Sequence, residues 1–253
     1  LKFLSTSIIV VAAIALAAAA STLVSAESTE ILSLGFSSEA ETLKHVDNTT
    51  ECYDSGDDGT AKEYVDAVNE RFVFEGDNTD TSAGYDEPIA VVQGYNESDG
   101  SSSYAVMPYN YTVQADFMVP GTPGRGNFYI LPRYGNVNNK YEVAVDIEYN
   151  NLVFNKMVGG SWNNIKTTPL GFTVGTNTWC TLSVEVRWEY SPVKCGSNTK
   201  TDEVWDGSIS PSSYNGLAFL GFDYNEEFKA FMDNVVVEAP LEKIGEEPHD
   251  EDI

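Results

Sequence analysis

Apolar and polar residues alternate with period two along much of the chain between Tyr104 and Glu238. The clearest run covers 141–149, Tyr-Glu-Val-Ala-Val-Asp-Ile-Glu-Tyr, and Asn150-Asn151 then leads into a second run at 152–157, Leu-Val-Phe-Asn-Lys-Met. Such alternation is typical of strands with one buried face, and asparagine is common in the tight turns between them. The pattern therefore predicts a β-hairpin over these residues.

Further short runs predict more strands, at 30–36, 71–75, 89–93, 111–119, 128–133, 165–168, 179–188, 216–222 and 228–238. Clusters of Gly, Pro, Asn and Ser separate them, which is typical of turns. The acidic segment 37–66 is expected to be a loop, with one helical turn around 61–68. The composition and spacing predict an all-β fold, an antiparallel two-sheet β-sandwich of the jelly-roll type.

The two ends of the chain differ from this pattern. Residues 1–26 combine Lys2, an apolar run from Ile8 to Ala20 and the small-residue sequence Val24-Ser25-Ala26, as expected of a cleaved secretory signal peptide. The alternative is an uncleaved membrane anchor. We expect a sandwich at 27–238 and an acidic disordered tail at 239–253. The protein is therefore predicted to be secreted and to lie outside the membrane.

The chain is strongly acidic, with a formal charge of −25 over 253 residues. This charge argues against binding to nucleic acid or to anionic membranes, because phosphate groups would be repelled. Three cysteines in an exported chain predict one disulfide, and Cys180 and Cys195 are the favoured pair because they flank a predicted hairpin. Cys52, in an acidic loop, could compete for either or pair between two chains.

The order of these motifs resembles the concanavalin A-like lectin/glucanase superfamily. The resemblance rests on Tyr-x-Val-x-Val at 141–145, Asn-Leu-x-Phe-x-Lys at 151–156, a Gly-Gly-x-Trp turn at 159–162 and Trp-Cys-Thr-Leu-Ser-Val-Glu-Val at 179–186. The nearest branch is that of laminin-G-like and carbohydrate-binding modules. In that family an Asp-Asn pair, here Asp233-Asn234, opens the last strand beside the first.

Three carboxylates are the catalytic candidates that this resemblance implies. The glucanase branch carries Glu-x-Asp-x-Glu on one strand, and Glu142, Asp146 and Glu148 lie in the corresponding region. A retaining mechanism needs two carboxyl groups about 5 Å apart across the scissile bond. The first position of the triad is occupied by Ala144, so a catalytic nucleophile is missing. We therefore expect a protein without this activity, with hydrolase or lyase activity as the alternative.

A structural calcium ion is the cofactor that the resemblance implies, because related modules hold one near the last strand. Asp233 is the main candidate ligand, and Asp77 and Asp80, in the loop after 71–75, would add oxygen ligands. The alternative is that Asp233 only hydrogen-bonds to backbone at the start of a strand.

Aromatic residues near predicted loops are candidates for sugar binding, because sugar C–H faces stack on Trp and Tyr while hydroxyl groups bond to polar side chains. The candidates are Arg133, Tyr134, Trp162 and Trp205, whereas Trp179 and Trp188 are expected in the core. Packing in the core or at its rim is the alternative for each. We thus expect a secreted, non-catalytic module that binds a polysaccharide or glycan; the alternatives are a polysaccharide-degrading enzyme and a structural surface protein.

Overall fold

The computed structural model describes residues 28–37, 46–47, 50–52, 62–78, 86–96, 101–108, 110–121, 126–186, 190–204, 216–223 and 227–240. Within these ranges the chain forms strands and turns, and no helix is assigned. No described helix could therefore span a membrane. The predicted signal peptide lies outside the described residues, as does the predicted tail from residue 241 onward.

The strands form two antiparallel sheets, which we call sheet A and sheet B. Sheet A runs in the order β15 (Asn198–Glu203), β14 (Tyr190–Cys195), β13 (Cys180–Val186), β8 (Tyr111–Met118), β17 (Glu227–Pro240), β5 (Arg71–Asp77) and β4 (Lys62–Asp66), with β1 (Ser28–Leu34) paired to β17. Sheet B runs in the order β12 (Ser161–Pro169), β11 (Asn151–Val158), β10 (Lys140–Asp146), β9 (Asn127–Tyr134), β16 (Gly216–Phe222), β6 (Asp86–Asn96) and β2 (Val46–Asp47). Two further strands, β3 (Thr50–Cys52) and β7 (Ser101–Tyr104), pair with β6.

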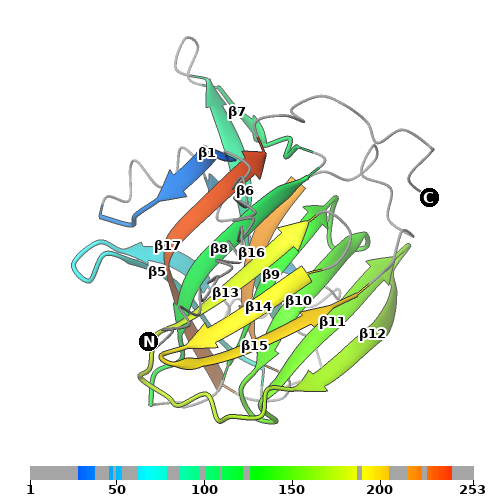
Figure 1. The fold of residues 1–253 in the computed structure, drawn as a ribbon. Helices are drawn as coiled ribbons and strands as arrows, with labels where there is room; N and C mark the ends of the chain where they lie inside the picture. The colour runs from blue at the N-terminus through cyan, green and yellow to red at the C-terminus, as the bar shows by residue number, and fades with distance from the viewer. Residues whose placement is uncertain are drawn as a thin grey trace, which may run out of the picture.

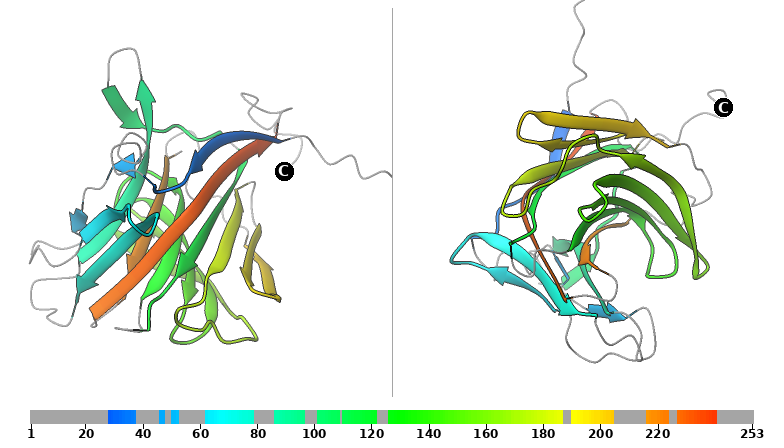
Figure 2. Two further views of the ribbon diagram at one scale, coloured as in Figure 1. Left: turned by 90° about the vertical axis from the view of Figure 1, so that its left-hand side faces the viewer. Right: turned by 90° about the horizontal axis from the view of Figure 1, so that it is seen from below.

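The two sheets lie face to face and are strongly curved, as Figures 1 and 2 show. Neighbours in each sheet are often distant in sequence: β17 lies between β8 and β5, and β16 lies between β9 and β6. This connectivity and the two-layer packing confirm the predicted all-β jelly-roll sandwich.

The core between the sheets is built from alternate residues of the facing strands. Phe128 of sheet B is its centre: its ring stacks on that of Phe117 from sheet A, with centroids 5.2 Å apart. It also contacts Phe219 on the neighbouring strand β16 and Phe74 on β5. Each such aromatic contact adds about 0.5–1.5 kcal/mol beyond the burial of apolar area.

The predicted β10–β11 hairpin is confirmed, with register pairs from Lys140–Met157 to Asp146–Asn151. The expected first strand, 141–149, is longer than the observed one, because residues 147–150 form the turn. Asn150 adopts a φ of 54° in this turn, and its side-chain oxygen accepts a hydrogen bond from the Val174 backbone N–H at 2.7 Å.

Two other expectations about local structure are wrong. The helical turn expected around 61–68 is instead the edge strand β4, in which Tyr64 pairs with Val73. Asp233-Asn234 does not open the last strand: β17 begins at Glu227, and its ladder with β8 has a bulge between Asp233 and Val236. Asn234 has a φ of 49°, which Asn tolerates better than most residues.

The predicted Cys180–Cys195 disulfide is confirmed and joins β13 to β14, with Cα atoms 4.3 Å apart. At the same side of the sandwich, the edge strands of the two sheets are bridged by side chains. Lys166 and Thr168 of β12 both bond to the carboxylate of Asp202 on β15. These contacts join sheet A to sheet B where no backbone ladder does.

Gly221 on β16 faces sheet A at a point where there is no room for a side chain. A Cβ at this position would lie 2.6 Å from the Cβ of Phe74 and 3.0 Å from that of Ala230. We expect Gly221→Ala to lower the free energy of unfolding by about 1–3 kcal/mol through overpacking. Gly35→Ala is the control, because nothing lies within 4 Å of its added Cβ. Urea unfolding would measure both; equal stability of the two variants would contradict the prediction.

Candidate functional site

The outer face of sheet B, meaning the face turned away from sheet A, holds several of the residues that the sequence singles out, among them Glu142, Asp146 and Trp162. Its middle is apolar and buried, with a cluster formed by Ile89, Val91, Tyr129, Leu131, Tyr134, Ala144, Ala218, Leu220, Phe222 and Phe228. Toward the edge strand β12 this face becomes polar and exposed. Sheet B is therefore buried on both sides near β16 and open to solvent at one edge.

Polar side chains form a connected row across this face. Lys140 is fully buried, and its Nζ atom lies 2.7 Å from Glu87 Oε2 and 3.3 Å from Glu142 Oε1. Asn155 Nδ2 donates to Glu142 Oε2 at 3.2 Å, and Asn164 Nδ2 donates to Asn155 Oδ1 at 2.9 Å. The row runs from β6 through β10 and β11 to the exposed edge strand β12.

Burial and charge act in opposite directions on Lys140. Burial alone would lower its pKa, but the carboxylates of Glu87 and Glu142 outweigh this effect and raise the pKa above the ordinary lysine value. The side chain is therefore an ammonium ion held between two carboxylates and shielded from water.

The three catalytic candidates do not form one constellation. Glu142 is buried and bonded to Lys140 and Asn155, whereas Glu148 lies in the exposed turn after β10. Asp146, at the end of β10, accepts a hydrogen bond from the Tyr149 backbone N–H at 3.0 Å. Burial raises its pKa above the ordinary value, and the negative charge of Glu148 raises it further. Ala144, the residue between Glu142 and Asp146 on this face, is part of the apolar cluster.

Arg133 and Tyr134 lie at the buried end of β9, only 5% and 4% exposed, rather than at an exposed loop. Arg133 is the extra residue of a bulge between β9 and β16, where Gly216 pairs with Tyr134 and Leu217 with Pro132. Its φ is 53°, and its backbone N–H donates to the hydroxyl of Tyr111, from the opposite sheet, at 3.4 Å. Their predicted role in ligand binding stays a prediction.

Trp162 differs from these residues because it is exposed. It lies on β12 opposite Met157, so its indole is on the same face as Asn155 and Asn164, and it is 48% exposed. The expectation that Trp179 is in the core is wrong: it precedes β13 and is 41% exposed. Trp188 and Trp205 lie outside the described residues.

The proposed calcium ligands are not gathered in the described part of the chain. Asp77 pairs with Glu227 at one end of the β5–β17 ladder, whereas Asp233 follows Met232, which pairs with Phe72 near the other end. Asp80 lies outside the described residues. No group of three or more His, Cys, Asp or Glu side chains within those residues is arranged to hold a metal ion.

Asp233 nevertheless lies in an acidic environment. Its partner across the ladder is Asp116. Burial raises the pKa of Asp233, and the charges of Asp116 and Glu70 raise it further. Asp116 itself accepts hydrogen bonds from Thr181 at 2.6 Å and from Asn234 at 3.0 Å. The alternative role of Asp233 also has support, because it accepts a backbone hydrogen bond from Asn234 at 2.7 Å.

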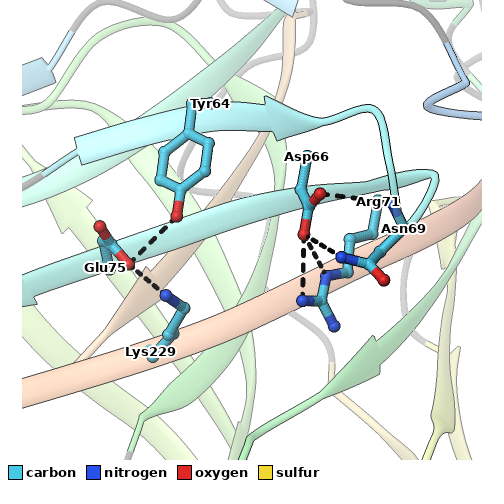
Figure 3. A network of polar contacts seen from close by, with 6 residues as sticks. All are labelled: Tyr64, Asp66, Asn69, Arg71, Glu75 and Lys229. Atoms are coloured by element: carbon cyan, nitrogen blue, oxygen red, sulfur yellow. Dashed lines mark hydrogen bonds and ion pairs between the residues drawn. The ribbon is translucent and has the colours of Figure 1, made fainter.

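The outer face of sheet A carries a second polar network, over β4, β5 and β17 (Figure 3). Asp66 accepts from Asn69 at 2.8 Å and forms an ion pair with Arg71 at 3.0 Å. Glu75 bonds to Tyr64 and Lys229, and the Arg71 guanidinium stacks 3.6 Å above the Phe231 ring. All the charged members have partners within the network, and it joins the three strands.

Sequence reasoning missed Lys140, Asn155, Asn164 and Glu87. The pairing of Asn155 with Glu142 could have been predicted, because the position of the Asn150-Asn151 turn sets the register of the hairpin. The contact between Glu87 and Lys140 spans 53 residues and had no local signal.

Comparisons with known proteins support the fold. The structure is similar to that of a GlcNAcα1-4Gal releasing endo-β-galactosidase from Clostridium perfringens, with a TM-score of 0.52 and 10% identity, over 86% of this chain and 63% of that chain. It is also similar to carbohydrate binding module CBM66 from Bacillus subtilis, with a TM-score of 0.45 and 12% identity, over 82% and 95%. A third similar structure is domain 4 of AbnA, a GH43 extracellular arabinanase from Geobacillus stearothermophilus, in complex with arabinotriose. The TM-score is 0.48 and the identity 13%, over 85% of this chain and 94% of that chain.

The chain matches no protein-family model and no curated protein sequence. The similarity to the Clostridium perfringens protein, at 10% identity, shows the fold alone. That fold is the concanavalin A-like jelly roll that the sequence predicts.

The buried ion pairs of Lys140 with Glu87 and Glu142 should contribute directly to stability. Lys140→Met leaves Glu87 and Glu142 buried beside each other without the cation, so we expect the free energy of unfolding to fall by about 3–5 kcal/mol. Lys166→Met is the matched control, because the side chain of Lys166 is 42% exposed and its pair with Asp202 should contribute at most about 1 kcal/mol. Urea unfolding of both variants measures the difference; equal losses would contradict the prediction.

Proposed function

We propose that this β-sandwich is a secreted, non-catalytic module that binds a polysaccharide or glycan. The observation that carries the proposal is the exposed indole of Trp162 on the regular edge strand β12. A large aromatic side chain held open to solvent on a strand offers a flat apolar surface. The C–H face of a sugar ring stacks on such a surface.

Polar groups beside Trp162 are already held in place. Asn164 lies on the same face and donates to Asn155 Oδ1 and to Thr167 Oγ1, at 2.9 and 3.1 Å. Both Asn164 and Thr167 are exposed at the surface of β12. Because their conformations are fixed by these contacts, little side-chain entropy would be lost when a sugar hydroxyl binds to them. An aromatic platform flanked by ordered amide and hydroxyl groups favours a neutral sugar.

The similarity of fold supports the same class of ligand. The Clostridium perfringens protein named above is, by its name, an enzyme that releases a disaccharide from a carbohydrate. Its fold similarity extends over most of this chain, although at 10% identity it does not carry over the activity.

Two features favour binding over catalysis. Ala144 occupies the position of the glucanase nucleophile and is packed among apolar side chains. Glu142 is 5% exposed and is bonded to Lys140 and Asn155, so it is not presented to a substrate.

The disulfide between Cys180 and Cys195 fits an oxidising, extracellular environment.

The test compares two exposed tryptophans. We expect Trp162→Ala to abolish or reduce at least about tenfold the binding to a glycan that the wild-type protein retains, since stacking of this kind contributes more than about 1.4 kcal/mol. Trp179→Ala, at a similarly exposed indole before β13, should bind as the wild type does. A glycan array and retention on insoluble polysaccharides identify the ligand. No binding by the wild-type protein, or equal binding by both variants, would refute the proposal.

Calcium binding, which the family resemblance implies, remains a further proposal. A cation that binds only the folded state raises the midpoint of thermal unfolding by mass action. We expect excess calcium to raise this midpoint relative to EDTA, and Asp233→Asn to reduce the rise. An unchanged midpoint would contradict calcium binding and leave the proposed sugar site unaffected.

A further inference from the structure

A buried amine and a buried carboxamide share one carboxylate on the outer face of sheet B. Lys140, Glu142 and Asn155 are 0%, 5% and 6% exposed, respectively. Lys140 Nζ lies 3.3 Å from Glu142 Oε1, and Asn155 Nδ2 donates to Glu142 Oε2 at 3.2 Å. The two oxygens of one carboxylate thus hold a nitrogen nucleophile and an amide side by side. The proposed sugar site does not use Lys140, and it uses Asn155 only to hold Asn164 in place.

The register of the hairpin brings Lys140 and Asn155 within reach of each other. Glu142 pairs with Asn155 and Lys140 pairs with Met157, so Lys140 and Asn155 are diagonal neighbours on the same face of two adjacent strands. Such neighbours lie about 7–8 Å apart across the two strands, a distance that a lysine side chain spans.

The carbonyl group of Asn155 is polarised from the side opposite to Glu142. Asn164 Nδ2 donates to Asn155 Oδ1 at 2.9 Å, and Asn164 is itself held by a second hydrogen bond to Thr167. A fixed donor at this oxygen withdraws electron density from the Asn155 Cγ atom. The same donor would stabilise the negative charge that forms on this oxygen during nucleophilic attack.

We propose that Lys140 and Asn155 are a self-modification site, at which the lysine amine displaces ammonia from the asparagine carboxamide and forms an isopeptide cross-link between β10 and β11. The reaction is an acyl transfer within one chain. It needs no cofactor and no oxidant, because an amide is exchanged for an amide.

Each proton in this reaction has an acceptor in contact with it. Lys140 starts as an ammonium ion and passes one proton to Glu87, whose Oε2 lies 2.7 Å from Nζ. The amine lone pair then attacks Asn155 Cγ, forming the new C–N bond and placing the negative charge on Oδ1. Glu142 takes the second proton from Nζ at one oxygen and supplies a proton to Nδ2 from the other.

The tetrahedral intermediate collapses when the bond between Cγ and Nδ2 breaks. Ammonia leaves and accepts the proton held by Glu87, so an ammonium ion and an amide replace the starting ammonium ion and carboxamide. The Lys140 proton can pass directly to a carboxylate, because Nζ lies 2.7 Å from Glu87 Oε2 and 3.3 Å from Glu142 Oε1. Exclusion of water also protects the new bond from hydrolysis.

Peptide mass spectrometry of the full chain, after reduction of its disulfide, tests the proposal. Trypsin cleaves after lysine only when the side-chain amine is free. We expect one peptide covering 134–156, uncleaved at Lys140 and lighter than its sequence by one molecule of ammonia. Cleavage at Lys140 with the full sequence mass would overturn the proposal. Loss of ammonia with cleavage at Lys140 would also overturn it, because this result indicates cyclisation of the asparagine alone.

Variants assign the roles of the residues. Lys140→Arg and Asn155→Ala should each show the full sequence mass, and Glu142→Gln should reduce the cross-linked fraction at least tenfold. Glu148→Gln, which changes an exposed carboxylate in the turn after the same strand, should cross-link as the wild type does. Equal cross-linking in Glu142→Gln would overturn the role of Glu142. The wild-type peptide decides the existence of the bond even if a variant fails to fold.

Discussion

Burial of sheet B on both faces is the constraint on which the rest of the structure depends. All seven residues of β16 are buried, with alternate side chains packed toward sheet A and into the apolar cluster on the outer face. A strand in this position has no exposed side on which polar groups are solvated. Any polar side chain that shares the outer face near the centre must therefore find its partner within the protein.

The Lys140 row meets this requirement. An isolated ammonium ion at full burial would be prohibitively costly, and the two carboxylates and the two asparagine amides of the row supply the charges and hydrogen bonds that water would otherwise provide. The row reaches solvent only at β12. The exposed Asn164 is thus connected, through bonded side chains, to the most deeply buried charge described in the chain.

Much of the fold was predictable because its signals are local. Alternation of apolar residues gave the β10–β11 hairpin and the strands β8, β13 and β17, and the cysteine spacing gave the disulfide. Strand β15 was missed because its sequence, Asn-Thr-Lys-Thr-Asp-Glu, has no apolar residue. Strand β4 was missed because Tyr64 and Val65 lie between charged residues, which hides the alternation. Edge strands of this kind are stabilised by their neighbours and by contacts such as that between Lys166 and Asp202.

The candidate site was predictable only in part, for reasons that can be stated residue by residue. Glu142 was recognisable as a carboxylate on a strand, but its partner Glu87 comes from a strand that only the tertiary fold brings near. Arg133 and Tyr134 were expected beside a loop, but strand β9 continues to Tyr134. The bulge that allows this depends on pairing with Gly216, which is distant in sequence and gives no local signal. Trp162 was expected near a loop and Trp179 in the core, and the packing shows that both are exposed.

The pairing of β1 with β17 has a mechanical consequence. Ser28 lies opposite Pro240 at the outer end of this antiparallel ladder, so the two strands leave the sandwich side by side (Figure 2). A pulling force applied between these two residues would separate β1 from β17 like a zipper, breaking one hydrogen bond at a time. Glu238 pairs with Glu30 of β1 and also with Thr112 of β8, so β17 would stay anchored to β8 while β1 detached first.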